Sequence, residues 1–411
     1  MNKFVPLNQV AKYSKKRIKS IEANIDSFIT TDNILPNKAG ITVATNLPPS
    51  GNAMPAYEVD NILVANIRPY LKKIWFANRS GACSADVLVF EVAKSCDPKF
   101  IYYSLFVDDF FKHMMRGAKG TKMPRGTKSQ ILDFLVPDIH LKNQQKISSV
   151  LSALDSKIQL NKKINAELEQ AAKTLFDYWF VQFEFPNAKG MPYKASSGKM
   201  IWNEKLKVEI PDGWSNGVLS DVGKIIGGST PAREMDNYFA ASGTAWITPK
   251  DLASNGENKF ITKGEVSVSE EGIKSASLNL MPKGTILLSS RAPIGYMAIS
   301  REVVTTNQGF KSFVPKAGYS TPFVFYAVKN SLPAIVSNAS GSTFKEVSGS
   351  VLKTISICLP PLAIIEKYTK IADGIFEKQN KLELENQKLS ELRDWLLPML
   401  MNGQIKILNH A

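Results

Sequence analysis

Few residues in this chain have the types and spacing that catalysis needs. The best set for metal-dependent nuclease chemistry is Asp251 with Glu257 and Lys259, in a polar stretch that also suits an ordinary solvated turn. The three histidines and three cysteines are scattered and show no metal-ligand spacing. The sequence contains neither a G-x-x-x-x-G-K-[ST] phosphate loop nor a Pro-Pro-aromatic methylation loop. We therefore expect a binding protein that has no catalytic residues and holds no metal.

Cations in the first third of the chain are arranged in a way that suits a polyanion. Four lie in one run near the N-terminus, and five alternate with glycines in RGAKGTKMPRGTK. Glycine lets a backbone approach a phosphate, and spaced cations can straddle a strand. The alternative for that loop is a mobile surface loop, and for the NIRPYLKK residues a role in the fold. The candidate DNA contacts here are Lys15, Lys16, Arg17, Lys19, Arg68, Tyr70, Arg116, Lys119, Lys122, Arg125 and Lys128.

A second group of candidates follows residue 225, in the strings GGSTPAR, ITPKDL, SRAPIG and TTNQGF. An arginine suits the edge of guanine, and an Asn or Gln amide suits adenine. The alternative is that short polar side chains beside glycines cap turns. The candidates are Ser229, Thr230, Arg233, Thr248, Lys250, Arg291, Asn307 and Gln308, with Lys345 as a phosphate contact.

Two long amphipathic segments must position these residues. In the first, no proline or glycine occurs between Pro137 and Pro186, and apolar residues recur at alternating steps of four and three. This spacing is typical of a helix that packs along another helix. The seam runs Ile147, Leu151, Leu154, Ile158, Asn161, Asn165, Leu168, Ala172, Leu175 and Trp179.

The second segment repeats the pattern, so the two helices are expected to pack as an antiparallel pair. Its seam runs Ile371, Ile375, Lys378, Leu382, Glu385, Leu389, Leu392, Leu396 and Met399. Polar residues interrupt the middle of both seams, and a buried polar residue in such a seam costs stability but fixes register. The expected helix-register residues are Asn161, Asn165, Lys378 and Glu385.

The parts that precede the two helices also resemble each other. NILVANIRP aligns with TILLSSRAP and FIYYSL with FVFYAV, which makes the chain a tandem repeat. The fold expected is α+β, with two mixed α/β domains joined by two long helices as a coiled coil with pseudo-two-fold symmetry. The expected segments are 1–136 (globular), 137–182 (helix), 183–208 (extended surface linker), 209–359 (globular) and 360–411 (helix).

The net charge of +14 lies mainly in the globular parts. Residues 1–136 hold 19 Lys and Arg against 11 Asp and Glu, and residues 205–359 hold 16 against 12, whereas residues 360–411 are neutral. Neutralising phosphates releases counterions, so this distribution favours a nucleic acid as partner. The first residues contain no apolar signal core and no stretch approaches 18 apolar residues, so we expect a cytoplasmic protein with no membrane partner.

The chain resembles the specificity subunit of type I restriction-modification enzymes over nearly its whole length. The strings that carry the resemblance are LFDYWFVQFEFPN, GMPYKASSGKMIWNE, EIPDGW, IIGGSTPAR, AWITPKDL, SRAPIG, TTNQGF and LLPMLMNGQI. In the first domain, NILVANIRPYLKKIWFA followed by GACSADVLVF is similar to one variety of target-recognition domain.

The resemblance implies a non-catalytic subunit whose two target-recognition domains each read half of a bipartite DNA site. The helices would set the unread spacer and dock methyltransferase subunits. S-adenosylmethionine, ATP and magnesium would then be bound by methyltransferase and restriction/translocase partners, and no cofactor by this chain. The alternatives are a single-chain enzyme that modifies or cuts DNA, and a helical scaffold protein.

Overall fold

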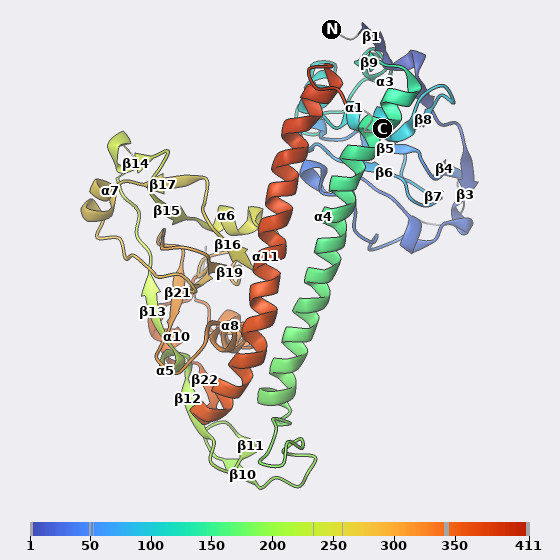
Figure 1. The fold of residues 1–411 in the computed structure, drawn as a ribbon. Coiled ribbons are helices and arrows are strands. Elements are labelled where there is room, and N and C mark those ends of the chain that lie inside the picture. Colours follow the sequence, from blue (N-terminus) through green and yellow to red (C-terminus); the bar gives the residue numbers. More distant parts are fainter. Residues whose placement is uncertain are drawn as a thin grey trace. The chain divides into compact units, whose positions relative to one another are not determined.

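The computed structural model describes residues 3–48, 51, 53–232, 234–256, 258–340 and 345–407. The chain divides into two compact units, the first comprising Met1–Gln159 with Gln387–Ala411 and the second Leu160–Asn386. Each unit contains one globular part and a portion of both long helices, α4 (Leu141–Phe176) and α11 (Leu362–Met401), which are green and red in Figure 1. Among the described residues, no helix is long and apolar enough to cross a membrane.

The first unit is built on an antiparallel sheet with the strand order β2-β8-β5-β6. Its strands are β2 (Ala11–Tyr13), β8 (Val87–Val92), β5 (Ile62–Ala65) and β6 (Ile74–Phe76). The other strands form the sheet β3-β4-β7 and the pair β1-β9. They are β3 (Arg17–Lys19), β4 (Ala53–Tyr57), β7 (Gly81–Ala82), β1 (Lys3–Pro6) and β9 (Leu135–Asp138).

Helices supply the rest of the core of the first unit. They are α1 (Pro98–Leu105), α2 (Asp108–Arg116), α3 (Lys128–Ile131) and a 3-10 turn, η5 (Pro69–Leu71). All four residues of β5 are buried, which is why its sequence ILVA does not alternate with polar residues. The long helices complete this core with Ile147, Leu151 and Leu397.

The second unit contains two larger sheets, with the orders β13-β21-β18-β19-β16 and β14-β17-β15-β20. The strands of the first are β13 (Gly223–Gly227), β21 (Lys311–Pro315), β18 (Ile286–Leu288), β19 (Met297–Ser300) and β16 (Phe260–Ile261). Those of the second are β14 (Phe239–Ala240), β17 (Val266–Val268), β15 (Thr244–Ile247) and β20 (Val304–Thr306). The pairs β12 (Ser215–Val218) with β22 (Ser356–Leu359) and β10 (Met200–Asn203) with β11 (Val208–Pro211) complete the strands.

The tandem repeat is visible in the strand pairings. The pairings β2·β8, β5·β8 and β5·β6 of the first unit correspond to β13·β21, β18·β21 and β18·β19 of the second, and β1·β9 corresponds to β12·β22. Helices α8 (Thr321–Asn330), α9 (Leu332–Ser337) and α10 (Gly349–Thr354) lie between β21 and β22, as α1, α2 and α3 lie between β8 and β9. The second unit also contains α5 (Leu219–Val222), α6 (Pro249–Ser254) and α7 (Glu270–Ser275).

The long helices pack antiparallel, as expected from their spacing. In the second unit the side chain of Asn161 donates to Glu385 at 2.8 Å, and that of Gln379 donates to Glu169 at 3.3 Å, so residue numbers rise along α4 as they fall along α11. In the first unit Arg393 of α11 donates to Asp155 of α4 at 2.8 Å. The expected seam of α4 is confirmed, and Asn161 at its centre is fully buried.

The expected seam of α11 is correct at the buried Leu382 and at Glu385, which contacts Asn161, but it is wrong at Ile371 and Lys378. Ile371 is 49% exposed and Lys378 is also exposed, whereas the residues that follow them, Ala372 and Gln379, are buried. Helix α11 packs on the globular part of the second unit as well as on α4, for example through Phe376 against Phe260. Its buried face is therefore wider than a coiled-coil seam, and its sequence spacing does not identify the centre of that face.

A buried carboxylate attaches α11 to the globular part of the second unit. Glu383 is 5% exposed and accepts hydrogen bonds from the backbone N–H groups of Lys259 at 2.8 Å and Phe260 at 3.1 Å. Arg301, which follows β19, donates its Nη2 to the same carboxylate at 2.7 Å. Three donors of the globular part thus depend on one helix side chain.

The linker expected at 183–208 is not an extended surface connection. Phe185 in this segment is buried, and its ring stacks on Tyr193 at 4.6 Å and on Trp214 at 5.1 Å between centroids. The hairpin β10-β11 begins within the same segment. The Pro, Gly, Ser and Lys content suggested an open chain, but the aromatic side chains between those residues fold it onto the core of the second unit.

Candidate nucleic-acid interface

Three segments of the first unit meet in one junction, which we call the first junction. The segment after β5 contacts the segment before β8 through Asn66 N–H, which donates to Asp86 O at 2.8 Å. It also contacts the glycine-rich loop, because Gly126 N–H donates to Asn66 O at 3.3 Å and Arg68 N–H to Pro124 O at 2.9 Å. Residues 66–68, 86 and 124–126 are therefore neighbours, although they are far apart in sequence.

The glycine at 126 allows this close approach. A Cβ atom at that position would lie 2.9 Å from Ile131 Cδ1 and 3.0 Å from Asn66 Oδ1. A larger residue at this position would therefore require the side chain of Ile131 or Asn66 to shift. Gly126 thus serves the packing of the junction, and the cations of the loop remain at the surface.

All five predicted cations of the loop are exposed. Arg125 is exposed and pairs with Asp86, with 3.1 Å between Nη2 and Oδ1. Lys128 is exposed too, and its Nζ lies 5.9 Å from the ring centroid of Tyr13. Three of the five cations of this loop have no side-chain hydrogen bond or ion pair among the described residues. We call them the loop cations: Arg116, Lys119 and Lys122.

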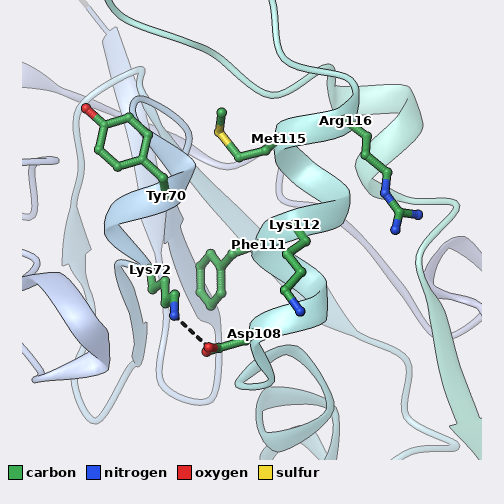
Figure 2. A pocket seen from close by; sticks show the side chains of 7 residues that line it. All are labelled: Tyr70, Lys72, Asp108, Phe111, Lys112, Met115 and Arg116. Atoms are coloured by element: carbon green, nitrogen blue, oxygen red, sulfur yellow. Dashed lines mark hydrogen bonds and ion pairs between the residues drawn. The ribbon is translucent and has the colours of Figure 1, made fainter. Parts of the chain in front are cut away.

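A hollow between η5 and α2 is lined by one of these cations, Arg116 (Figure 2). Tyr70 lies on one side and is 51% exposed, Arg116 lies on the other, and the buried Phe111 lines it between them. Lys72 also lines it but pairs with Asp108 at 2.6 Å, and this hydrogen bond lowers the pKa of that carboxyl. Tyr70 and Arg116, both predicted contacts, therefore line one hollow, although the guanidinium of Arg116 points away from the ring of Tyr70.

The N-terminal basic run lies on a different sheet of the first unit. Arg17 and Lys19 belong to β3, which pairs with β4, and Lys15 and Lys16 precede it. All four are exposed, but Lys16 pairs with Glu58 at 2.5 Å and the guanidinium of Arg17 donates to Ala53 O. Among the described residues, no hydrogen bond or ion pair connects this run with the first junction.

The second unit forms the same junction from equivalent residues, and we call it the second junction. Ser290 N–H donates to Gly309 O at 2.8 Å, and Val347 N–H donates to Ser290 O at 2.9 Å, as Asn66, Asp86 and Gly126 do in the first junction. The loop is closed in the same way, by paired backbone bonds between Ser340 and Glu346 here and between Lys119 and Arg125 there. The alignment of the repeats therefore extends to the loops that carry the candidate residues.

The side chains of the second junction differ from those of the first. Arg291 is exposed and donates its Nε to Glu346 Oε2 at 3.0 Å. Lys311 Nζ lies 3.8 Å from the other oxygen of this carboxylate. Lys345 is exposed beside it, and the loop residues 341–344 lie outside the described residues.

The ends of three strands bring the remaining candidates of the second unit together. Ser229, after β13, donates its N–H to Thr306 O at the end of β20, and Asn307 N–H donates to Ile247 O at the end of β15. The hydroxyl of Thr230 donates to the side chain of Gln308. Gly228 permits this contact, because a Cβ there would lie 2.0 Å from Asn307 O.

Some of these candidates have clear structural roles. Thr248 caps α6 together with Asp251, and its hydroxyl donates to that carboxylate at 2.6 Å. Asn307 Oδ1 accepts the N–H of Gly309 at 3.0 Å, as a turn cap does. Lys250 is exposed and pairs with Glu265 at 2.6 Å. Arg233 lies outside the described residues.

The nuclease-like set does not assemble among the described residues. Asp251 is engaged in the cap of α6, Glu257 lies outside the described residues, and Lys259 is 7% exposed in the core of the second unit. The ammonium of Lys259 pairs with Glu169 at 2.5 Å, and burial lowers the pKa of this lysine to about 8 although the carboxylate raises it. No group of His, Cys, Asp and Glu that could hold a metal ion occurs in the described part of the chain.

Two acidic residues of the junctions, Asp86 and Glu346, were not predicted from the sequence. A search for DNA contacts selects cations and amides, and neither acid lies in a motif. The signal that could have identified them is the repeat itself, because Arg125 and Glu346 occupy the same position of the two junctions with opposite charge.

Comparisons with known proteins agree with the repeat. The family model of the type I restriction modification DNA specificity domain matches residues 2–170 and again residues 211–394. The MjaIX specificity subunit of Methanocaldococcus jannaschii is 38% identical over 214 residues, and that alignment spans about half the length of each protein, 48% of this chain and 48% of the relative. The HindI specificity subunit of Haemophilus influenzae is 29% identical, and its alignment covers 92% of this chain and 94% of the relative.

A solved structure has the same fold over nearly the whole length. It is the S subunit of a type I restriction-modification system from M. genitalium, with a TM-score of 0.59 at 14% identity, covering 97% of this chain and 96% of that one. At this identity the likeness establishes the fold. The family model covers most of the chain and matches once in each half, so the chain belongs to the type I restriction-modification DNA specificity family.

Proposed function

We propose that this chain is the DNA-sequence-specificity subunit of a type I restriction-modification system. Each globular part reads one half of a bipartite site in double-stranded DNA, and the chain itself catalyses no reaction. Family membership supports this proposal, as do the relatives named as specificity subunits. The single observation that carries it is the pair of equivalent junctions, one in each unit, with the same backbone hydrogen bonds and different exposed polar side chains.

The charges of the junctions suit this function. The loop cations beside the first junction attract the phosphates of DNA of any sequence. This attraction positions the protein on DNA but does not distinguish between bases. Arg125 and Arg291 can donate two hydrogen bonds to guanine, and Gln308 can recognise adenine. Because the two junctions carry different side chains, the two half-sites should differ in sequence.

The long helices fix the length of the spacer that is not read. A helix of 36 residues, as α4 is, spans about 54 Å, which exceeds one turn of B-form DNA at about 34–36 Å. The buried Asn161 and the half-buried Asn165 and Glu385 hold the register of the helix pair, whereas the exposed Lys378 does not. The exposed faces of the same helices dock methyltransferase subunits.

The chemistry belongs to the partners of this chain. Methyltransferase subunits bind S-adenosylmethionine and modify adenine, and restriction/translocase subunits bind ATP and magnesium. All of them work in the cytoplasm, where the host DNA lies. This chain determines the DNA sequence at which they act.

A map of methylated adenines in the DNA of the organism, with and without this gene, tests the proposal. Deletion should abolish methylation at one split motif and leave all other motifs unchanged, which also yields both half-sites and the spacer. An unchanged map, in cells that express the methyltransferase subunits, would refute the proposal. Methylation or cleavage of DNA by the purified chain alone would instead establish an enzyme.

Exchange of one domain tests the assignment of the half-sites. Replacing residues 1–135 with the corresponding segment of another specificity subunit should change only one half of the methylated motif. The other half and the spacer should remain, because residues of the second unit read the former and the helices set the latter. A change of both halves together would contradict the independence of the two domains.

A further inference from the structure

Each junction contains one arginine paired with one carboxylate at the surface. In the first junction Arg125 Nη2 lies 3.1 Å from Asp86 Oδ1 and 3.2 Å from Oδ2. In the second junction Arg291 Nε lies 3.0 Å from Glu346 Oε2. The side chains are 59% and 37% exposed in the first pair, and 46% and 36% exposed in the second. Both pairs are therefore accessible to a large ligand.

The two pairs are built from different positions of the repeat. In the first junction the arginine comes from the glycine-rich loop and the acid from the segment before β8. In the second junction the acid Glu346 comes from the glycine-rich loop, at the position of Arg125, and Arg291 comes from the segment after β18. Copying one ancestral pair would have kept each charge in its own segment, so the pairing recurs at this place although its carriers differ.

Stability does not account for this recurrence. An ion pair at this exposure contributes little to folding, because solvent screens it and both side chains lose freedom. A carboxylate near the phosphates of DNA also weakens binding to DNA of any sequence. A surface that served only to attract DNA would therefore carry the arginine without the acid.

The geometry of the pairs suggests a positive role for the acids. Each carboxylate engages a single nitrogen of its guanidinium, and the other two nitrogens have no hydrogen-bond partner among the described residues. A guanidinium held in this way keeps donors in a fixed direction, whereas a free arginine samples many rotamers. Bidentate contact with guanine needs such an orientation.

We propose that Asp86 and Glu346 are positioning residues that orient Arg125 and Arg291 for base recognition, one in each half-site. This inference rests on the proposed function and deepens it, because it names the residue pair that sets specificity at one base pair in each half. The acids also weaken binding to other sequences. When no guanine is present to accept from the arginine, nothing offsets the repulsion between the carboxylate and the DNA phosphates.

The experiment selects duplexes from a pool of random DNA. The probe is the full-length chain in complex with the methyltransferase subunits of its own system, as wild type and as the variants D86N and E346Q. Each variant keeps the shape of the side chain and removes the charge. D86N should lower the base preference about tenfold at one position of one half-site, and E346Q should do so at one position of the other. Binding to unrelated DNA should become tighter in both.

Matched controls separate orientation from a general change of charge. D212N removes the acid of an exposed pair with Lys199 at 3.0 Å, and E91Q removes that of a pair with Lys12 at 3.5 Å, both outside the junctions. Neither should alter the base preference at any position. D86E restores a carboxylate and should recover preference that D86N loses.

The outcomes distinguish this inference from the proposed function. If the wild-type complex selects a bipartite motif and both D86N and E346Q select the same motif with the same preferences, the inference is overturned and the proposed function stands. Equal losses at all positions, or equal losses in the controls, would also overturn it. If the wild-type complex selects no motif, the proposed function fails together with the inference.

Discussion

The carboxylate that attaches α11 to the globular part of the second unit can be removed by the substitution Glu383→Leu. Leucine has a similar size, so the change removes the acceptor without leaving a large cavity. The N–H groups of Lys259 and Phe260 and the guanidinium of Arg301 lose their shared partner. Arg301 keeps Asn380 Oδ1 at 2.5 Å, so its charge is not left entirely without an acceptor.

The expected cost follows from these contacts. A buried donor left without an acceptor costs about 1–3 kcal/mol, and breaking a buried ion pair costs about 3–5 kcal/mol. Leucine regains roughly 2 kcal/mol from its apolar burial and from the carboxylate that no longer has to be desolvated. The net destabilisation of the attachment is therefore about 3 kcal/mol, near the lower end because Arg301 retains other acceptors.

Hydrogen exchange measures the free energy of local opening at this attachment. A local measurement is needed because a chain with two units does not necessarily unfold in a single two-state transition. The reporters are the amides of Ile299 and Arg301, which donate to Lys259 O at 2.8 Å and Ile261 O at 2.9 Å. Their protection should fall about 100-fold if the opening free energy drops by about 3 kcal/mol.

The control for this measurement is Glu366→Gln on the same helix. Glu366 pairs with Lys370 at 3.3 Å, and both side chains are more than 70% exposed. Loss of such a pair costs about 0.3–0.5 kcal/mol, so the amides of β19 should keep their protection. If Glu383→Leu changes protection no more than this control, the carboxylate does not hold the helix to the domain and the reasoning fails.

Three further predictions concern DNA binding, register and pH. Glutamine at all three loop cations should weaken binding to every sequence alike and flatten the slope of log affinity against log salt by about 0.9 per lost contact, measured by titration at several salt concentrations; an effect confined to one sequence would contradict a phosphate role. Leucine at Asn161 and Asn165 should raise the free energy of unfolding by about 1 kcal/mol, since each Oδ1 lacks a partner among the described residues, and should relax discrimination between duplexes whose spacers differ by one base pair; unchanged spacer preference would remove the register role. Burial alone would raise the pKa of Glu169, but the ammonium groups of Lys259 and Lys329 outweigh burial and lower the pKa to about 2. The carboxylate therefore stabilises the fold fully above its unfolded pKa of 4.5, and this stabilisation is lost as the pH falls from 4.5 toward 2. The free energy of unfolding should fall by no more than about 3 kcal/mol over this pH range, and Glu169→Gln should make it less dependent on pH there. If the variant and the wild type lost stability equally as the pH falls, the carboxylate would contribute nothing.

The sequence predicted those features that depend on local spacing. The seam of α4 could be identified because its apolar residues follow a helical period and its buried face lies mainly against one helix. The face of α11 could not be centred correctly, because Phe376 and Gln379 also pack on a globular domain whose position the spacing does not encode. The linker was wrongly predicted for a related reason, since composition weighs Pro, Gly and Ser but cannot show that Phe185 finds a partner in Trp214.

The candidate site was predictable by residue type but not by geometry. Glycines and cations in the loop of the first unit indicated a surface for phosphates, and the loop cations are indeed exposed. Pairing with Asp86 or Glu346 depends on segments brought together by the sheet, so no local pattern could reveal it. Asn307 and Thr248 illustrate the opposite limit, because a short polar residue beside a turn looks the same in sequence whether it caps the turn or faces a ligand.

In the two junctions, the contacts that form the recognition surface differ from the side chains that determine which bases it prefers. Backbone hydrogen bonds hold the three segments together in both units, with a close approach at Gly126 in the first, and these do not depend on the exposed side chains. Substitutions of exposed side chains usually change stability by less than about 0.5 kcal/mol, so the polar residues of a junction can vary without loss of the fold. The recurrence of an arginine with a carboxylate on this variable surface is therefore not a requirement of folding. It points instead to the demands of the ligand, which needs a guanidinium held in one direction at this place in each half of the chain.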